Sequence, residues 1–217
     1  MKNIDGTKQS PSNEKLKVIS KKEALEKLKL RCNHCKACEL NNTRHNAVFA
    51  DGNPKTASVV LIGEAPGENE DLQGIPFIGR AGKLLNEFLN EAGLSRGKDL
   101  YIINTVKCRP PKNRVPTNAE KVACRRFLLE QLEIIAPKII LLCGATALKS
   151  FYNGKSTISK IRGEVFDIEI NGEKYPVMPI FHPSYLLRNH STAEGSPRYL
   201  MLNDLKKVYL KIKLLDR

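Results

Sequence analysis

The stretch Ser58-Val-Val-Leu-Ile-Gly-Glu-Ala-Pro-Gly67 decides the fold, because an unbroken apolar run ends at a glycine that is followed by an acid. Such a run, without polar alternation, is typical of a parallel strand covered on both faces. Similar runs occupy residues 100–104, 138–143 and 177–181, and helical patterns separate them. We therefore expect an α/β fold: a three-layer α/β/α sandwich with a central, mostly parallel four-stranded sheet.

Local signals place the ends of several elements. Ser20 and Thr117 each begin a capping-box pattern, which predicts the start of a helix. Asn171-Gly172 predicts the turn of a β-hairpin. Residues 1–19 are polar and predict a disordered extension, and residues 20–217 are expected to form a single domain.

Polar side chains follow three of the predicted strands. Glu64 comes directly after the first, Asn104 ends the second, and His182 follows the last. Ligands of such sheets bind beyond the carboxyl ends of the strands, so we expect the three groups at one rim. A carboxylate can support a developing cation or orient water, and an amide offers a donor and an acceptor side by side. Each residue alone also fits a structural role; their convergence indicates an active site.

The charge is concentrated in two segments. The chain has 36 Lys and Arg against 23 Asp and Glu, a formal net charge of +13, and residues 1–38 and 107–126 carry almost all of the excess. For 107–126 this favours a nucleic-acid partner, whereas the first 20 residues also fit a solvated tail. The longest apolar stretch, 139–148, is about half of a membrane span, and no signal peptide is recognisable. We expect a soluble, cytoplasmic, nucleoid-associated monomer with no membrane contact.

The cysteines suggest a metal site. Cys143 lies within an apolar run and is expected to pack as a small hydrophobe. The other five form an N-terminal group and a widely spaced pair: Cys32, Cys35 and Cys38, then Cys108 and Cys124. Without a secretory signal, metal ligation is favoured over disulfides. The spacing leaves zinc and an iron–sulfur cluster open, although the wide pair fits the cluster somewhat better.

Three long motifs resemble a known family. The first is Gly63-Glu-Ala-Pro-Gly-Glu-Asn-Glu-Asp-Leu-Gln-Gly-Ile-Pro-Phe-Ile-Gly-Arg-Ala-Gly82. This segment and two later ones, Asn104-Thr-Val-Lys-Cys-Arg-Pro-Pro-Lys-Asn-Arg114 and His182-Pro-Ser-Tyr-Leu-Leu-Arg-Asn189, are similar to signatures of the family 4 uracil-DNA glycosylases. They occur in the same order as in that family, and the resemblance extends over about residues 35–205.

The resemblance implies a cofactor and a set of site residues. The cofactor is a [4Fe–4S] cluster held by Cys35, Cys38, Cys108 and Cys124, with Cys32 as an extra cysteine. Glu64 is implied as the catalytic carboxylate, and His182 as the group that stabilises the departing base. The implied uracil-binding residues are Ala65, Phe77 and Asn104, with Glu70 or Asp71 as a wall against the methyl group of thymine. The expected DNA contacts are Lys107, Arg109 and Arg114 of the basic segment, and Leu186, Leu187 and Arg188, which are placed to wedge into the gap left by the flipped base.

The expected activity is hydrolysis of the N-glycosidic bond of uracil in single- or double-stranded DNA, which leaves an abasic site. Neither the glutamate motif nor the histidine motif offers a matching lysine, so we expect a monofunctional enzyme. Residues 112–117 contain no histidine, which argues against covalent trapping of DNA. The alternatives are a non-catalytic iron–sulfur DNA-binding module and a nucleoside hydrolase; neither explains both the polar rim and the basic segment.

Overall fold

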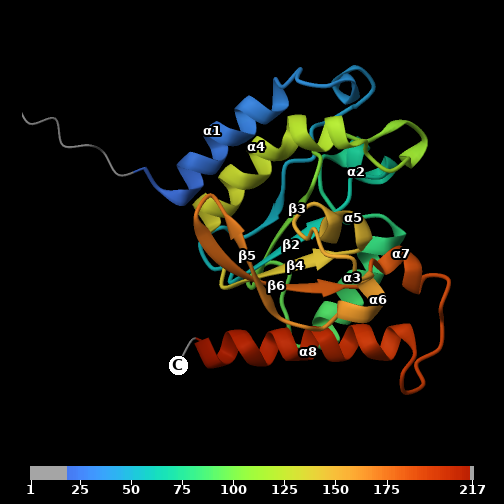
Figure 1. Cartoon of the computed structure of the whole chain (residues 1–217). Coiled ribbons are helices and arrows are strands. Elements are labelled where there is room, and N and C mark those ends of the chain that lie inside the picture. The colour runs from blue at the N-terminus through green and yellow to red at the C-terminus, as the bar shows by residue number, and fades with distance from the viewer. Residues whose placement is uncertain (1–18, 216–217) are drawn as a thin grey trace, which may run out of the picture.

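The computed structural model describes residues 19–215, so the extension predicted at 1–19 lies almost wholly outside the described residues. The centre of the fold is a six-stranded sheet in the order β1-β3-β2-β4-β6-β5 (Figure 1). The strands are β1 (Asp51–Gly52), β2 (Val59–Gly63), β3 (Leu100–Asn104), β4 (Ile139–Cys143), β5 (Phe166–Ile170) and β6 (Glu173–Ile180).

The predicted strand number was too low. The four inner strands are parallel, as expected, but β1 and β5 add an antiparallel strand at each edge. The two-residue β1 is too short to produce a hydrophobic pattern, and β5 is only half covered. The hairpin turn between β5 and β6 was placed correctly: Asn171 and Gly172 have φ values of 53° and 84°, the left-handed region that a tight hairpin turn requires.

Helices cover both faces of the sheet. They are α1 (Lys21–Asn33), α2 (Glu68–Gln73), α3 (Arg80–Glu91), α4 (Asn118–Ile135), α5 (Ala145–Lys149), α6 (Ile158–Ile161), α7 (Pro183–Leu186) and α8 (Pro197–Leu215). The helices α1 and α4 lie on one face, and α3 and α8 lie on the other (Figure 1). Both capping boxes are present, at Ser20 and at Thr117.

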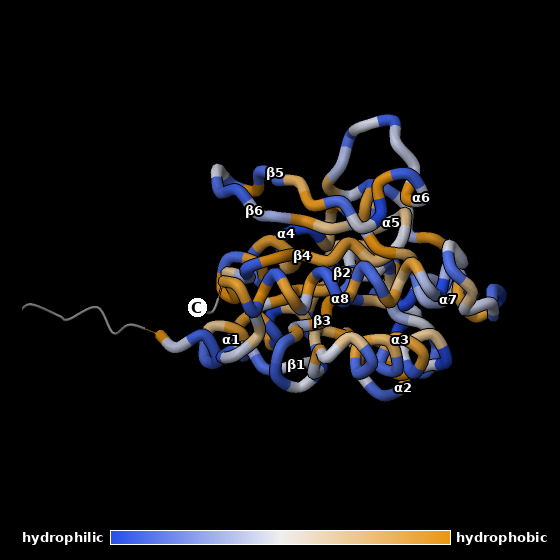
Figure 2. Tube along the Cα trace, turned by 90° about the horizontal axis from the view of Figure 1, so that it is seen from below, coloured by the Kyte–Doolittle hydropathy of each residue, from blue (hydrophilic) through white to orange (hydrophobic). Residues whose placement is uncertain are grey.

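Side chains that alternate along each inner strand build two separate cores. In β2, Val60 and Ile62 pack with α1 and α4, whereas Val59 and Leu61 pack with α3 and α8. Figure 2 shows this apolar centre between the helices, whose outer faces are hydrophilic. The three-layer α/β/α sandwich is therefore confirmed. None of the described helices has the length and apolar character needed to cross a membrane.

The register of the parallel strands aligns their carboxyl ends. Gly63 pairs with Asn104 at the ends of β2 and β3, and Cys143 pairs with Ile180 at the ends of β4 and β6. The segments that follow these four residues therefore start along one edge of the sheet, and this edge positions the site.

Candidate active site

A cavity of about 340 Å³ opens at the carboxyl edge of the sheet. Its walls come from the segments that follow β2, β3 and β6, and they include Glu64, Asn104 and His182. The convergence expected from the sequence is thus found. The lining also includes Ala65, Glu70, Phe77, Arg114 and Ser184.

Glu64 is held by a residue that sequence reasoning missed. Its Oε2 accepts a hydrogen bond from Oγ1 of Thr146, in the first turn of α5. Its backbone carbonyl accepts from Oγ1 of Thr105 at 2.6 Å. The carboxylate is therefore fixed from the neighbouring strand end, through a contact between residues 82 positions apart. The only available signal was the position of Thr146, just beyond the end of β4.

Asn104 presents an unsatisfied acceptor in the cavity wall. The residue is 2% exposed, and its Oδ1 is buried without a hydrogen-bond partner among the described residues. A buried acceptor without a partner costs free energy, so this atom favours a ligand that carries an N–H group. Gly63 makes the arrangement possible, because a Cβ atom at this position would overlap both Oδ1 of Asn104 and the ring of Phe77.

Phe77 is fixed in an uncommon backbone conformation, with φ of 52°. Arg96 holds it from behind: its Nη1 donates to the Phe77 carbonyl at 2.8 Å and its Nη2 to the Pro76 carbonyl at 2.5 Å. Its Nε also donates to Asp51 at 2.7 Å, which anchors the guanidinium on β1. The Phe77 ring lies 5.8 Å from the ring of His182, centroid to centroid. No local sequence pattern pointed to Arg96.

His182 is the N-cap of α7, and its ring is oriented by the residues that follow. The backbone N–H of Ser184 donates to Nδ1 at 3.2 Å, and Oγ of Ser184 lies 2.7 Å from the same atom. Because Nδ1 accepts, the proton of the neutral ring is on Nε2. Burial lowers the pKa of His182, while Glu64 and Glu70 act in the opposite direction. The neutral ring thus keeps one N–H donor at Nε2.

The two candidate wall residues have different positions. Glu70 lines the cavity, and its Oε1 accepts from the backbone N–H groups of Ile78 (3.0 Å) and Gly79 (2.8 Å). Asp71 does not line it: this side chain is fully buried and accepts from the backbone N and Nδ1 of His45. The expectation for Asp71 was wrong, because successive residues of the helix α2 point in different directions.

The predicted DNA contacts divide into three kinds. The expectation that Lys107 contacts DNA was wrong, because this residue is 1% exposed and lies inside the protein. Arg109 donates to Asn113 and Glu68, and Arg114 forms a bidentate pair with Glu120, so these two guanidinium groups brace the basic segment.

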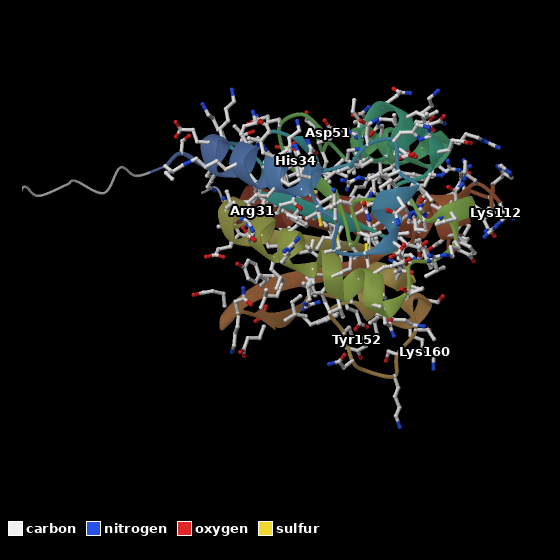
Figure 3. The ribbon with its side chains drawn as sticks, turned by 90° about the horizontal axis from the view of Figure 1, so that it is seen from above. Arg31, His34, Asp51, Lys112, Tyr152 and Lys160 are labelled. Carbon is white, nitrogen blue, oxygen red and sulfur yellow. The ribbon has the colours of Figure 1, made fainter. Side chains whose placement is uncertain are left out.

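The remaining predicted contacts lie nearer the surface. Lys112, which was not among the predicted contacts, projects at the outer edge of the molecule (Figure 3). Arg188 is exposed and Leu187 is half-buried, whereas Leu186 is fully buried and belongs to the core. Leu186 is therefore not available as part of the wedge expected from residues 186–188.

Five cysteines line a second cavity, together with Arg44 and Lys107; they are Cys32, Cys35, Cys38, Cys108 and Cys124. All six cysteines lie in the described part of the chain, and none forms a disulfide. The sixth, Cys143, is buried in β4, as expected. Within residues 19–215, no three His, Cys, Asp or Glu side chains converge on a single metal ion, whereas the four cysteines of a [4Fe–4S] cluster bind four different iron atoms and do not need to converge.

Three N–H groups point at the sulfurs of this cavity. Arg44 donates to Cys108 at 3.0 Å, the backbone of Lys107 to Cys124 at 3.3 Å, and Arg126 to Cys35 at 3.4 Å. Thiolate sulfurs that ligate iron accept hydrogen bonds of this kind, which tune the cluster. The donor set therefore fits an iron–sulfur group.

Comparison with known proteins identifies the family. The family described as the uracil DNA glycosylase superfamily matches residues 49–206. The chain belongs to this superfamily. Among its members, a type-4 uracil-DNA glycosylase from Thermotoga maritima is 48% identical over 197 residues, which cover 90% of this chain and 98% of the relative. Type-4 enzymes from Archaeoglobus fulgidus (43% over 169 residues; 76% of this chain, 84% of the relative) and Sulfurisphaera tokodaii (40% over 191 residues; 86% and 84%) also match.

The resemblance to the family 4 glycosylases is thereby confirmed. The residues that match the superfamily contain all six strands of the sheet, and they include the cavity residues Glu64, Asn104 and His182.

Proposed function

We propose that the protein hydrolyses the N-glycosidic bond of uracil in DNA, releases the free base and leaves an abasic site. The observation that carries this proposal is the buried, unpaired Oδ1 of Asn104 in a cavity shared with Glu64 and His182. The names of the relatives from Thermotoga and Archaeoglobus give independent support.

Asn104 reads the base. Its Oδ1 accepts from N3–H of uracil, and its amide NH2 donates to O4. Cytosine reverses this pattern and would leave buried groups unpaired on both sides, which a site built for hydrogen bonding rejects strongly. The target nucleotide leaves the stack to enter the cavity, and Phe77 and Ala65 contact the flipped base.

Glu70 excludes thymine. Two backbone N–H groups fix its carboxylate, so the side chain does not swing away from a larger base. The 5-methyl group of thymine would meet this wall, whereas uracil has only a hydrogen there.

Glu64 and His182 stabilise the charges that develop as the bond breaks. The sugar becomes oxocarbenium-like, and the Glu64 carboxylate, held by Thr146, supports that positive charge and orients the attacking water. The base departs as an anion, and Nε2–H of His182 donates to its O2. Interactions that strengthen only in the transition state raise the rate, by about 10²–10³ for one such donor.

The reaction stops at the abasic site. A lyase needs an amine nucleophile, and no lysine of the described chain lines the cavity. Water is therefore the nucleophile, and the enzyme is monofunctional.

The DNA lies over the carboxyl edge of the sheet, in single- or double-stranded form. Arg109 and Arg114 hold the basic segment against the phosphates, and Leu187 and Arg188 enter the gap left by the flipped base. The protein acts as a monomer in the cytoplasm, associated with the nucleoid.

The cysteine cavity holds a [4Fe–4S] cluster, ligated by Cys35, Cys38, Cys108 and Cys124. The cluster supplies a cross-link between the N-terminal segment and the basic segment, and it takes no part in the hydrolysis. The N–H groups of Arg44, Lys107 and Arg126 at the sulfurs support this assignment. Iron and sulfide analysis, with the absorbance of the purified protein, distinguishes the cluster from zinc.

The function is tested with an oligonucleotide that contains one uracil, followed by alkaline cleavage of abasic sites. The wild-type protein should produce strand breaks, and Glu64→Ala and His182→Ala should not. Intact strands with tight binding by the wild type would instead favour the non-catalytic module. Release of uracil from deoxyuridine but not from DNA would favour the nucleoside hydrolase.

A further inference from the structure

Lys107 is a buried cation between the two cavities. Its side chain is 1% exposed and lines the cysteine cavity. Its Nζ donates to the backbone carbonyl of Asn104 at 3.0 Å. Its own backbone N–H donates to Cys124, and its carbonyl accepts from Val48 at 2.8 Å. The residue therefore contacts both the cysteine cavity and the strand end that carries the base-reading amide.

The charge of Lys107 has one source of compensation. A buried ammonium is unfavourable unless an opposite charge lies nearby. Among the described residues, Lys107 forms no ion pair with a carboxylate, and it shares its cavity with the sulfurs of Cys32, Cys108 and Cys124. Four thiolates around a cluster core leave a net negative charge, which a buried ammonium balances.

The segment from Asn104 to Cys108 joins the two cavities by backbone contacts as well. The N–H groups of Thr105 and Val106 donate to the carbonyls of Gly63 and Glu64, at 3.0 and 3.4 Å. A displacement of this segment therefore moves the amide of Asn104 and the backbone of Glu64 together.

We propose that Lys107 is a positioning residue, whose ammonium balances the charge of the cysteine cluster and whose hydrogen bond to the Asn104 carbonyl fixes the base-reading amide. The inference rests on the proposed function. It assigns the cluster a second role: the negative charge of the cluster holds the ammonium of Lys107, which in turn holds the Asn104 amide in its position in the uracil site.

The test compares Lys107→Met, which keeps the length of the side chain but removes its charge, with Lys98→Met. Lys98 is exposed near the start of β3, at the opposite end of the strand, so it controls for the loss of one charge. Iron content, the midpoint potential of the cluster, and kcat and KM for uracil excision are measured for the wild type and both variants. Lys107→Met should have a more negative potential, because an electron enters less readily when a nearby cation is removed. It should also lose about tenfold or more in kcat/KM for uracil, while binding DNA without uracil normally.

A potential and a kcat/KM equal to those of the wild type in Lys107→Met would overturn the proposal. If Lys107→Met does not assemble the cluster, the measurements on this variant are replaced by amide hydrogen exchange of the wild-type protein, before and after removal of the iron. The amides of Thr105 and Val106 should then exchange faster, and those of the β5–β6 hairpin should not; unchanged exchange at 105–106 would also overturn the proposal. A wild type that contains iron but does not excise uracil would refute the proposed function alone, since the potential of Lys107→Met still tests the charge balance.

Discussion

Oγ1 of Thr146 donates to Oε2 of Glu64, so the carboxylate that follows β2 is fixed by the helix that follows β4. The two residues follow neighbouring strands, β2 and β4, which pair in parallel and begin with the pair Val59 and Ile139. One oxygen of the carboxylate is thereby committed to the protein. Its orientation relative to the sugar is set before the substrate binds.

Replacement of Thr146 by valine should reduce kcat by about 10²-fold, because a misdirected reacting group loses its alignment. Thr146→Ser keeps the hydroxyl and should recover most of the rate, which a purely steric role would not allow. Single-turnover excision of uracil measures both variants. An equal loss in the serine and valine variants would show that the hydroxyl is not the relevant group.

The pH dependence of the reaction should follow His182. Burial lowers its pKa below the ordinary value of 6.5, so the neutral ring persists at pH values where an exposed histidine is protonated. The acidic limb of the kcat profile should therefore lie below pH 6.5. For stability the sign is the same: as the pH falls below 6.5, the unfolded chain takes up the proton first, and the free energy of unfolding decreases.

A titration of the His182 ring by NMR, together with denaturant unfolding at several pH values, checks this prediction. His182→Asn should abolish the change in stability between pH 7 and pH 5 that this residue causes. A ring that titrates above 6.5 would contradict it.

Gly63→Ala should disable base recognition. The added methyl group overlaps Asn104 and Phe77, so one of them must move out of the cavity. Overpacking of this kind costs about 1–3 kcal/mol of stability, and KM for uracil-containing DNA should rise. Gly97→Ala is the matched control, because a Cβ atom there meets nothing within 4 Å. Wild-type kinetics in Gly63→Ala would show that the two side chains do not need this close approach.

Substitutions of the adjacent acids Glu70 and Asp71 should have different effects: the first should change the selectivity for the base, and the second the stability of the fold. Glu70→Ala opens the wall of the cavity and should permit measurable excision of thymine from a G·T mismatch, with slower uracil excision. Asp71→Asn should leave the selectivity unchanged but destabilise the fold by about 1–3 kcal/mol, because one of the two oxygens that accept from the backbone N–H and the ring Nδ1 of His45 is replaced by an NH2 donor. Excision assays with both bases and thermal unfolding distinguish the two. Thymine activity in Asp71→Asn rather than in Glu70→Ala would reverse the assignment.

Cys32 should be dispensable for the cluster. It lies within α1 and packs in the core, whereas Cys38 lies in the loop beyond the helix. Cys32→Ala should keep the iron content and the visible absorbance of the wild type, and Cys38→Ala should lose both. Retention of iron in Cys38→Ala with loss in Cys32→Ala would show that the first cysteine is the ligand.

The sequence predicted those parts of the fold that depend on local patterns. The unbroken apolar runs of β2, β3 and β4 predicted their burial on both faces, and the capping boxes predicted where α1 and α4 begin. The convergence of Glu64, Asn104 and His182 followed from the rule that parallel strands end at one edge.

The errors came from contacts that no local pattern encodes. Lys107 was assigned to the DNA surface because it lies in the basic segment, but it is buried, lines the cysteine cavity and donates to the Asn104 carbonyl. Thr146 and Arg96 were missed because their partners lie on other elements. The edge strand β1 was missed because two residues give no periodicity.

The two hydrogen bonds from Arg96 to the carbonyls of Pro76 and Phe77 affect the free energy of substrate binding, because they hold the Phe77 backbone in place. In the proposed function, the Phe77 ring that receives the pyrimidine is thus held in place before any DNA arrives, which lowers the ordering cost of binding. Less of the stacking free energy is then spent on ordering the ring, and more of it opposes the return of the nucleotide to the helix. As the protein searches along DNA, each extruded base can thus meet a binding surface that is already formed.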